Sequence, residues 1–214
     1  MKTIRYYGGR AVRIFKTFPW TCADTLVQIF AVTIWPAEYR KGVRVIDLFS
    51  DTRAEFLSRI GDALELIESK DQRRFKRVKR EIRAIVQMPC AMEAGYSRGL
   101  NVCRIDLRYY PFGADASFAT VLLACALIHE ATHGHLHRRR ILQNARNFAR
   151  VESLCYAEEI RFGNKLGFDL SILKSVGEAA RPLTPEEKAK IVKDAFADVK
   201  KDWKRCLADE NSVS

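Results

Sequence analysis

Three segments in the middle of the chain have a clear pattern of hydrophobic and polar positions. Residues 118–128 (FATVLLACALI) are apolar on every side, which predicts a buried helix. Residues 101–110 alternate apolar and polar side chains, which predicts a half-buried strand just before that helix. Residues 148–166 place apolar side chains at helical spacing, which predicts a second helix. Its apolar stripe consists of Val151, Cys155, Phe162 and Leu166.

Shorter patterns predict elements nearer the N-terminus. Residues 4–7 and 10–15 flank two glycines and predict a hairpin, and residues 43–49 read as a strand. Thr52 to Glu55 has the form of a capping box, which predicts a helix that runs to about Ser69.

Two further segments, in residues 71–88 and near the C-terminus, also have patterns that predict secondary structure. Residues 71–88 are ambiguous, because apolar residues recur at helical spacing while the end of the segment, RAIVQMP, is also typical of a strand stopped by Pro89. Thr184 to Glu187 predicts the start of a C-terminal helix, whose apolar stripe would dock on the rest of the protein.

The mixture of helices and strands favours the α+β class. A chain of 214 residues with 48% hydrophobic content is long enough to bury one sizeable core. Because residues 36–182 contain no stretch with linker composition, we expect a single domain over residues 1–214. Its core would span roughly residues 40–182, with residues 183–214 as the docking helix.

The end of the first helix carries a short motif with metal-binding geometry. His129, Glu130 and His133 form the pattern HExxH, and all four histidines of the chain lie within nine positions. Residues four apart lie on one face of a helix, so both imidazoles can reach a single ion. A zinc ion in such a site activates a water molecule, and Glu130 beside it would act as general base and acid. This is the chemistry of peptide hydrolysis.

The motif also has a simpler interpretation. Five-residue matches to HExxH occur on ordinary helix surfaces, where the same side chains form a salt bridge. Here the preceding helix is predicted to be buried, and buried polar groups need partners. We therefore expect a zinc site, with a structural histidine cluster or an inactive site as the alternatives.

A catalytic zinc site needs a third protein ligand, and the second helix offers one. Eighteen residues separate His133 from Glu152, which is enough for the chain to turn and return antiparallel. Glu158 is a competing ligand because it falls inside the apolar stripe. Tyr156, one turn after Glu152, either stabilises a developing oxyanion or is simply a partly buried aromatic side chain.

At these residues the chain resembles the gluzincin metallopeptidases, in which HExxH is followed by a glutamate on the next helix. His129, Glu130, His133 and Glu152 match the spacing HExxH-x18-E, and the resemblance covers roughly residues 117–166. It implies a zincin-like fold, with a small mixed or antiparallel sheet packed on the HExxH helix and the following ligand-bearing helix. It also implies that an edge strand before the HExxH helix binds extended substrate by strand addition.

The residues that follow the HExxH motif narrow the class of zinc peptidase that the chain can resemble. Leu136 and Arg139 occupy the positions where metzincins have a glycine and a third histidine, so that class is excluded. The exopeptidase recognition motif that usually accompanies the aminopeptidase spacing is also absent, and no aminopeptidase specificity is inferred. Gly134 is expected to end the helix just after the second ligand, which would leave His135 and His137 outside it.

Charge suggests a second class of function. The net charge is +11, and a basic run extends from Lys70 to Arg83. Such a run is often only a solvated face, but it can also bind nucleic acid or an anionic surface. The alternative to a peptidase acting on protein or peptide substrates is therefore a basic nucleic-acid-binding protein with a structural or inactive histidine cluster.

Cysteine and hydropathy patterns bear on the location of the protein. The six cysteines show no CxxC pairing and are typical of reduced core thiols, which favours a cytoplasmic protein. Residues 17–37 are largely apolar, but Asp24 and Gln28 interrupt them, so a core helix is expected and not a membrane span. Basic residues before this segment leave peripheral membrane association open.

Overall fold

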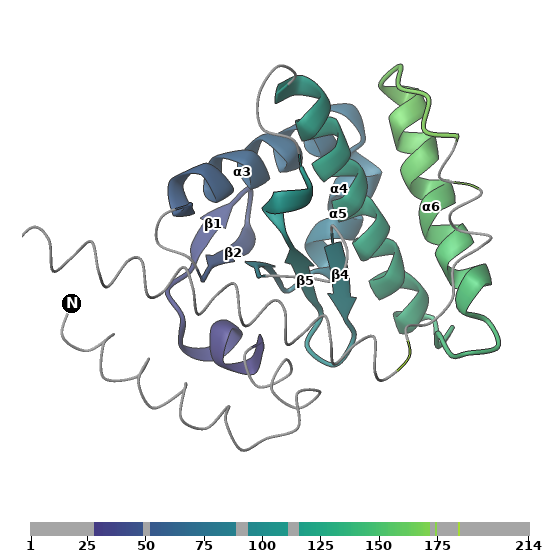
Figure 1. Cartoon of the computed structure of the whole chain (residues 1–214), viewed down its shortest axis with the longest axis horizontal. Coiled ribbons are helices and arrows are strands. Elements are labelled where there is room, and N and C mark those ends of the chain that lie inside the picture. Colours follow the sequence, from purple (N-terminus) through teal and green to yellow (C-terminus); the bar gives the residue numbers. More distant parts are fainter. Residues whose placement is uncertain are drawn as a thin grey trace, which may run out of the picture.

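The structure is a computed structural model that describes residues 28–48, 52–88, 94–110 and 116–171, together with residues 174 and 184. The predicted hairpin over residues 4–15 lies outside the described residues, as does the C-terminal helix beyond Thr184. The division into a core and a docking helix therefore stays a prediction. Within the described ranges the chain is a mixed α+β fold (Figure 1).

A five-stranded mixed sheet forms the centre of the fold, with the order β1-β2-β3-β5-β4. The parallel strands β2, β3 and β5 lie in the middle, and the antiparallel strands β1 and β4 form the edges. The strands are β1 (Glu38–Arg40), β2 (Val43–Asp47), β3 (Ala84–Gln87), β4 (Ala94–Ser97) and β5 (Val102–Ile105). Edge strand β4 packs against helix α5 (Ala116–Arg138), as Figure 1 shows.

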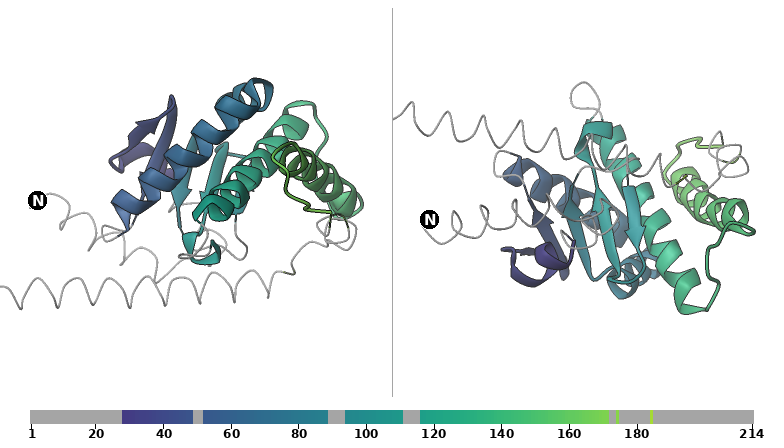
Figure 2. Two further views of the ribbon diagram at one scale, coloured as in Figure 1. Left: turned by 90° about the horizontal axis from the view of Figure 1, so that it is seen from above. Right: turned by 60° about the horizontal axis from the view of Figure 1, so that its bottom comes forward.

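Two apolar cores lie on opposite faces of the sheet. Successive strand residues point to opposite faces, so Ile85 and Cys103 enter the larger core while Val86 and Val102 enter the smaller one. The larger core joins the sheet to the helices α3 (Arg53–Lys70), α4 (Gln72–Glu81) and α5. Figure 2 shows how these helices lie over the sheet.

Helix α6 (Phe148–Lys165) carries the residues that the sequence predicts to face the HExxH motif. It packs along α5 and runs antiparallel to it, since Cys125 lies near Glu159 while His129 lies near Glu152. The predicted stripe is buried at Val151, Cys155 and Phe162. The prediction that a second helix follows the HExxH helix and runs antiparallel to it is therefore confirmed.

Residues 28–34 are helical and cover the smaller core. Ala31 and Val32 are buried against Ile46, Val86 and Met88 of the sheet. The expected core helix is thus present in the described part of residues 17–37. Among the described residues, no helix combines the length and the apolar character needed to cross a membrane.

Several predicted elements need correction. The strand predicted over residues 101–110 ends at Ile105, because Asp106 accepts a hydrogen bond from the backbone N–H of Arg108 and caps a short 3₁₀ turn over Leu107–Tyr109. This strand is also not an edge strand and is mostly buried, since β3 and β4 pair with its two sides. The edge strand beside α5 is β4, which the sequence pattern did not predict.

The start of α3 also differs from the prediction. The helix spans the expected residues, but the Thr52 side chain makes no capping hydrogen bond. Its hydroxyl lies instead 3.1 Å from the carboxamide of Gln87 on β3. Tertiary contact with the sheet therefore replaces the local capping box.

The ambiguous segment 71–88 contains both predicted structures in succession. Helix α4 ends at Glu81 and strand β3 begins at Ala84. Asp71 caps α4 by accepting a hydrogen bond from the backbone N–H of Arg74 at 3.0 Å.

Candidate metal centre

His129 and His133 present their imidazoles to a common point. They lie one turn apart on α5, and their Nε2 atoms are 3.2 Å apart. Two imidazole nitrogens at that distance must share a proton or a cation, because two bare lone pairs would repel each other. His129 is buried and His133 is half-buried, so bulk water does not screen this repulsion.

Glu152 approaches the same point from α6. One carboxylate oxygen lies 3.3 Å from Nε2 of His129, and the other lies 3.5 Å from Nε2 of His133. Burial would raise the pKa of Glu152, but the hydrogen bonds from His129 and His133 hold it well below its usual range. The structure therefore brings together the three residues that the sequence predicts as ligands, with the carboxylate in its charged form.

Cys155 adds a fourth donor to this group. One ligand atom each from His129, His133 and Cys155 lie within 4.8 Å of one another, so these three residues can hold a metal ion. Burial and the nearby charge of Glu152 raise the pKa of the Cys155 thiol, which therefore stays protonated without a cation. The sequence suggested only a core thiol at this position, although its spacing of three residues from Glu152 places it on the same side of α6.

Glu152 fits the histidine pair more closely than Cys155 does. Four-coordinate zinc with ligand bonds of about 2.0–2.1 Å separates neighbouring oxygen or nitrogen ligands by roughly 3.3–3.4 Å. Each of the two Glu152 contacts is near that separation, and each is made by a different carboxylate oxygen. The Cys155 sulfur and the two imidazole nitrogens lie within 4.8 Å of one another, and the contacts of Glu152 with the imidazoles are shorter.

Glu130 lies next to the ligand group and is buried. Burial raises the pKa of Glu130, while the positive charges of His129 and His133 act in the opposite direction. Its Oε2 atom is buried and has no hydrogen-bond partner among the described residues. A buried oxygen of this kind lacks the partner that such groups normally have, which fits a role in holding a water or a substrate group.

The outer side of the His129 ring is also held in place. Nδ1 lies 3.1 Å from a carboxylate oxygen of Glu159, and the ring of Tyr156 meets the imidazole edge-on with centroids 4.5 Å apart. Burial alone would lower the pKa of His129, but the hydrogen bonds with Glu152 and Glu159 raise it to about 10. The spacing of seven residues from Glu152 places Glu159 on the same face of α6, but the sequence does not reveal its contact with His129.

Gln143, in the connection between α5 and α6, contacts Glu152, the predicted third ligand. Its side-chain N–H donates a short hydrogen bond to Glu152. Arg98, which follows strand β4, holds Gln143 in turn by donating to its backbone carbonyl at 2.8 Å and to its side-chain oxygen. No local sequence pattern connects these residues, so the sequence could not have revealed this chain of contacts.

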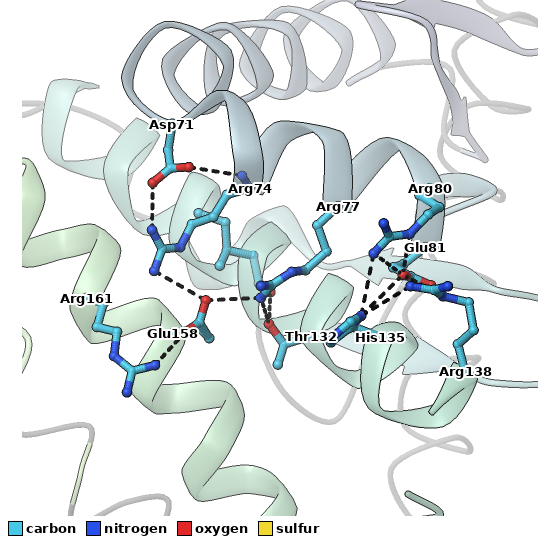
Figure 3. A network of polar contacts seen from close by, with 11 residues as sticks. Asp71, Arg74, Arg77, Arg80, Glu81, Thr132, His135, Arg138, Glu158 and Arg161 are labelled. Atoms are coloured by element: carbon cyan, nitrogen blue, oxygen red, sulfur yellow. Dashed lines mark hydrogen bonds and ion pairs between the residues drawn. The ribbon is translucent and has the colours of Figure 1, made fainter. Parts of the chain in front are cut away.

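Among the described residues, Glu158 forms its salt bridges with arginines and not with His129 or His133, so the structure does not support it as the alternative third ligand. Its carboxylate accepts from Arg77 at 3.0 Å and lies 3.2 Å from Arg74 and 2.5 Å from Arg161 (Figure 3). Glu158 lies six residues after Glu152, so it projects from a different side of α6. This contact joins α4 to α6.

The helix break predicted at Gly134 is also absent. Helix α5 continues to Arg138, so His135 and His137 are helical. His135 approaches the buried carboxylate of Glu81 at 3.6 Å, beside Arg80 and Arg138 (Figure 3). The glycine serves close packing: a Cβ atom at this position would lie 2.7 Å from the Tyr96 hydroxyl and 2.8 Å from Cβ of Glu81.

The basic run divides into two sets of side chains. Arg74 and Arg77 are half-buried and pair with Glu158. The remaining basic residues of the run are exposed: Lys70, Arg73, Lys76, Lys79, Arg80 and Arg83. Nucleic-acid or anionic-surface binding by this face stays a prediction, and fewer cations are available for it than the sequence suggests.

Comparison with known proteins gives no relative for this chain. A scan against models of protein families finds no match, and searches of curated proteins and of solved structures find none either. Function must therefore be argued from the site itself.

Proposed function

We propose that this protein is a zinc-dependent peptidase in which His129, His133 and Glu152 bind the metal. The main observation in support is the set of distances among their ligand atoms, 3.2, 3.3 and 3.5 Å. The 3.2 Å between the two imidazole nitrogens is close to the roughly 3.3–3.4 Å edge of a tetrahedral zinc site, and each carboxylate oxygen of Glu152 lies beside one of these nitrogens, so the carboxylate can supply the third ligand. Two imidazoles and one carboxylate are also a donor set that catalytic zinc sites use.

The chemistry of such a site requires an ion and a base. When bound, zinc would lower the pKa of a coordinated water toward about 7 and polarise the carbonyl group of a peptide bond. Glu130 follows His129 directly in the chain, and its buried Oε2 is available to accept the proton of that water. Glu130 would take that proton as general base and pass it to the leaving amine as general acid.

Three neighbouring residues would hold the ligands in position. Glu159 accepts from Nδ1 of His129, which directs the Nε2 lone pair toward the ion. Tyr156 packs against the same ring, and Gln143 fixes the carboxylate of Glu152. Ligands restrained in this way need little rearrangement when the ion binds.

Strand β4 offers a surface for an extended substrate. It is the edge strand nearest α5, and its outer side has no strand partner among the described residues. A peptide that pairs with this edge would run close to the end of α5 that carries the histidines. An HExxH helix, a ligand-bearing second helix and an adjacent edge strand support the zincin-like, gluzincin-type arrangement as part of this proposal.

The test is a peptidase assay on the zinc-loaded protein with the variant Glu130→Gln. We expect the variant to retain zinc and to lose activity by at least about a hundredfold, because the general base is removed while the ligands stay. Zinc-loaded protein without peptidase activity would contradict the proposal. Salt-sensitive nucleic-acid binding that Glu130→Gln leaves unchanged would instead support the alternative function of the basic face.

A further inference from the structure

Cys155 lies closer to the proposed zinc ligands than a purely structural thiol requires. It follows Glu152 by three residues on α6 and is fully buried. Its sulfur lies within 4.8 Å of ligand nitrogens on both His129 and His133. Three donor atoms from two helices therefore lie close together, and the two carboxylate oxygens of Glu152 lie 3.3 and 3.5 Å from Nε2 of His129 and of His133.

A small movement would bring the sulfur to bonding distance. In a tetrahedral zinc site with Zn–S of about 2.3 Å and Zn–N of about 2.0–2.1 Å, sulfur and nitrogen ligands lie roughly 3.5–3.6 Å apart. A sulfur within 4.8 Å of both nitrogens needs to move by little more than about 1 Å, which side-chain rotation can supply.

The surroundings of a second cysteine show what a structural thiol looks like in this protein. Cys125 is also buried, on α5, and its sulfur faces the backbone carbonyl of Glu159 at 3.9 Å. It belongs to the large apolar core, where a free cysteine behaves as a small hydrophobic side chain. The Cys155 side chain instead packs with Val151 and Leu136, and its sulfur also lies within 4.8 Å of the ligand nitrogens of His129 and His133.

We propose that Cys155 is a fourth protein ligand that closes the metal site in the resting protein. The site would then hold its ion with two imidazoles, one carboxylate and one thiolate. This inference rests on the proposed function and concerns the regulation of the same site. Structural zinc sites have four protein ligands, whereas a catalytic site keeps one position open. Cys155 must therefore leave the ion before a substrate can bind.

The exchange involves only a proton and a coordination bond. The thiol gives up its proton to solvent when the sulfur binds, and the thiolate recovers a proton when substrate displaces it. A donor set with a thiolate also favours zinc or cobalt over magnesium, calcium and manganese, which prefer oxygen ligands.

The test is the absorption spectrum of the full chain loaded with Co²⁺ in place of zinc. A thiolate bound to Co²⁺ gives a charge-transfer band in the near ultraviolet, which imidazole and carboxylate ligands do not give. We expect this band in the wild-type protein, its loss in Cys155→Ser at unchanged cobalt content, and its retention in the matched control Cys125→Ser. With zinc bound, Cys155→Ser should hydrolyse peptide severalfold faster, because the open position is always available.

The possible outcomes distinguish a failure of this inference from a failure of the proposed function. Bound cobalt without the band in the wild-type protein would overturn the role of Cys155 and leave the site of His129, His133 and Glu152 intact. A band that persists in Cys155→Ser would overturn it as well. If the wild-type protein binds no cobalt at all, the proposed metal site itself fails. Because the absence of the band in the wild-type protein is enough to overturn the inference, the test stays decisive even if Cys155→Ser does not fold.

Discussion

Nδ1 of His129 lies 3.1 Å from a carboxylate oxygen of Glu159, on the opposite side of the ring from the Nε2 atom that faces His133. The contact crosses from α5 to α6, so the packing of the two helices also sets the orientation of the first proposed ligand. A carboxylate in this place keeps the proton on Nδ1 and leaves Nε2 free to bind an ion.

Glu159→Gln should weaken zinc binding without removing a ligand. The substitution keeps the size of the side chain but removes the charge that supports His129, and loss of such a partner costs roughly tenfold or more in affinity. Competition with a chromogenic chelator measures the change. Glu158→Gln is the matched control, since the adjacent carboxylate contacts arginines and not the histidines. Equal effects of the two substitutions would contradict the assignment.

Glu158→Gln should instead reduce the stability of the fold. Glu158 joins α6 to Arg74 and Arg77 of α4, which are only 15% and 14% exposed at the side chain. Removing the charge leaves these guanidinium groups without their shared counter-ion, at an expected cost of about 2 kcal/mol in the free energy of unfolding. Urea denaturation of both proteins measures this difference. A variant as stable as the wild type would show that the contact contributes nothing.

The stability that Glu158 provides should depend on pH. Burial would raise the pKa of Glu158, but the hydrogen bond with Arg161 and the charges of Arg74 and Arg77 lower it below 4.5. A carboxyl group with a depressed pKa in the folded state stabilises the protein fully above its unfolded pKa and loses that effect as pH falls through the folded pKa. The stability difference between wild type and Glu158→Gln should thus be constant near neutral pH and shrink below about pH 4.5. A difference that grew on acidification would have the wrong sign.

Gly134→Ala should destabilise the protein although alanine favours helices. The added Cβ would lie 2.7 Å from the Tyr96 hydroxyl and 2.8 Å from Cβ of Glu81, so strand β4 and the end of α4 must shift. We expect a loss of about 1–3 kcal/mol. Gly61→Ala in α3 is the control, because its Cβ would meet only Arg40 at 3.7 Å. That variant should gain roughly 0.5–1 kcal/mol, as helix propensity predicts.

Arg98 and Gln143 should affect zinc binding through a single chain of contacts that ends at Glu152. Gln143 donates to Glu152, and Arg98 holds Gln143. Gln143→Ala should weaken zinc binding by roughly tenfold, and Arg98→Ala should have a smaller effect of the same kind. In the double variant the two effects should not add, since Arg98 has no role at the site once Gln143 is removed. Full additivity would show that Arg98 acts independently.

The sequence predicts the helix pair of the site well because its signals are local. The apolar run before His129 and the stripe from Val151 to Phe162 have helical period, and the HExxH spacing follows directly from helix geometry. The α+β class follows from the same patterns.

What the sequence leaves open depends on tertiary packing. Whether Glu152, Glu158 or Glu159 faces His129 is decided by the rotation of α6 against α5, which no local pattern fixes. Strand β4 (AGYS) has no alternation of apolar residues, and Gly95 leaves room for the side chain of Arg104 on its neighbour β5. Gly134 resembles a helix stop in sequence, whereas its lack of a side chain allows Tyr96 to approach α5.

The central claim is that His129, His133 and Glu152 hold a zinc ion. The most direct measurement is the zinc content of protein purified without a metal-affinity tag, for the wild type and for Glu152→Gln, with Glu158→Gln as control. We predict one zinc ion per chain in the wild type and in the control, and a large loss in Glu152→Gln. A wild-type protein that binds no zinc even when zinc is supplied would contradict this account.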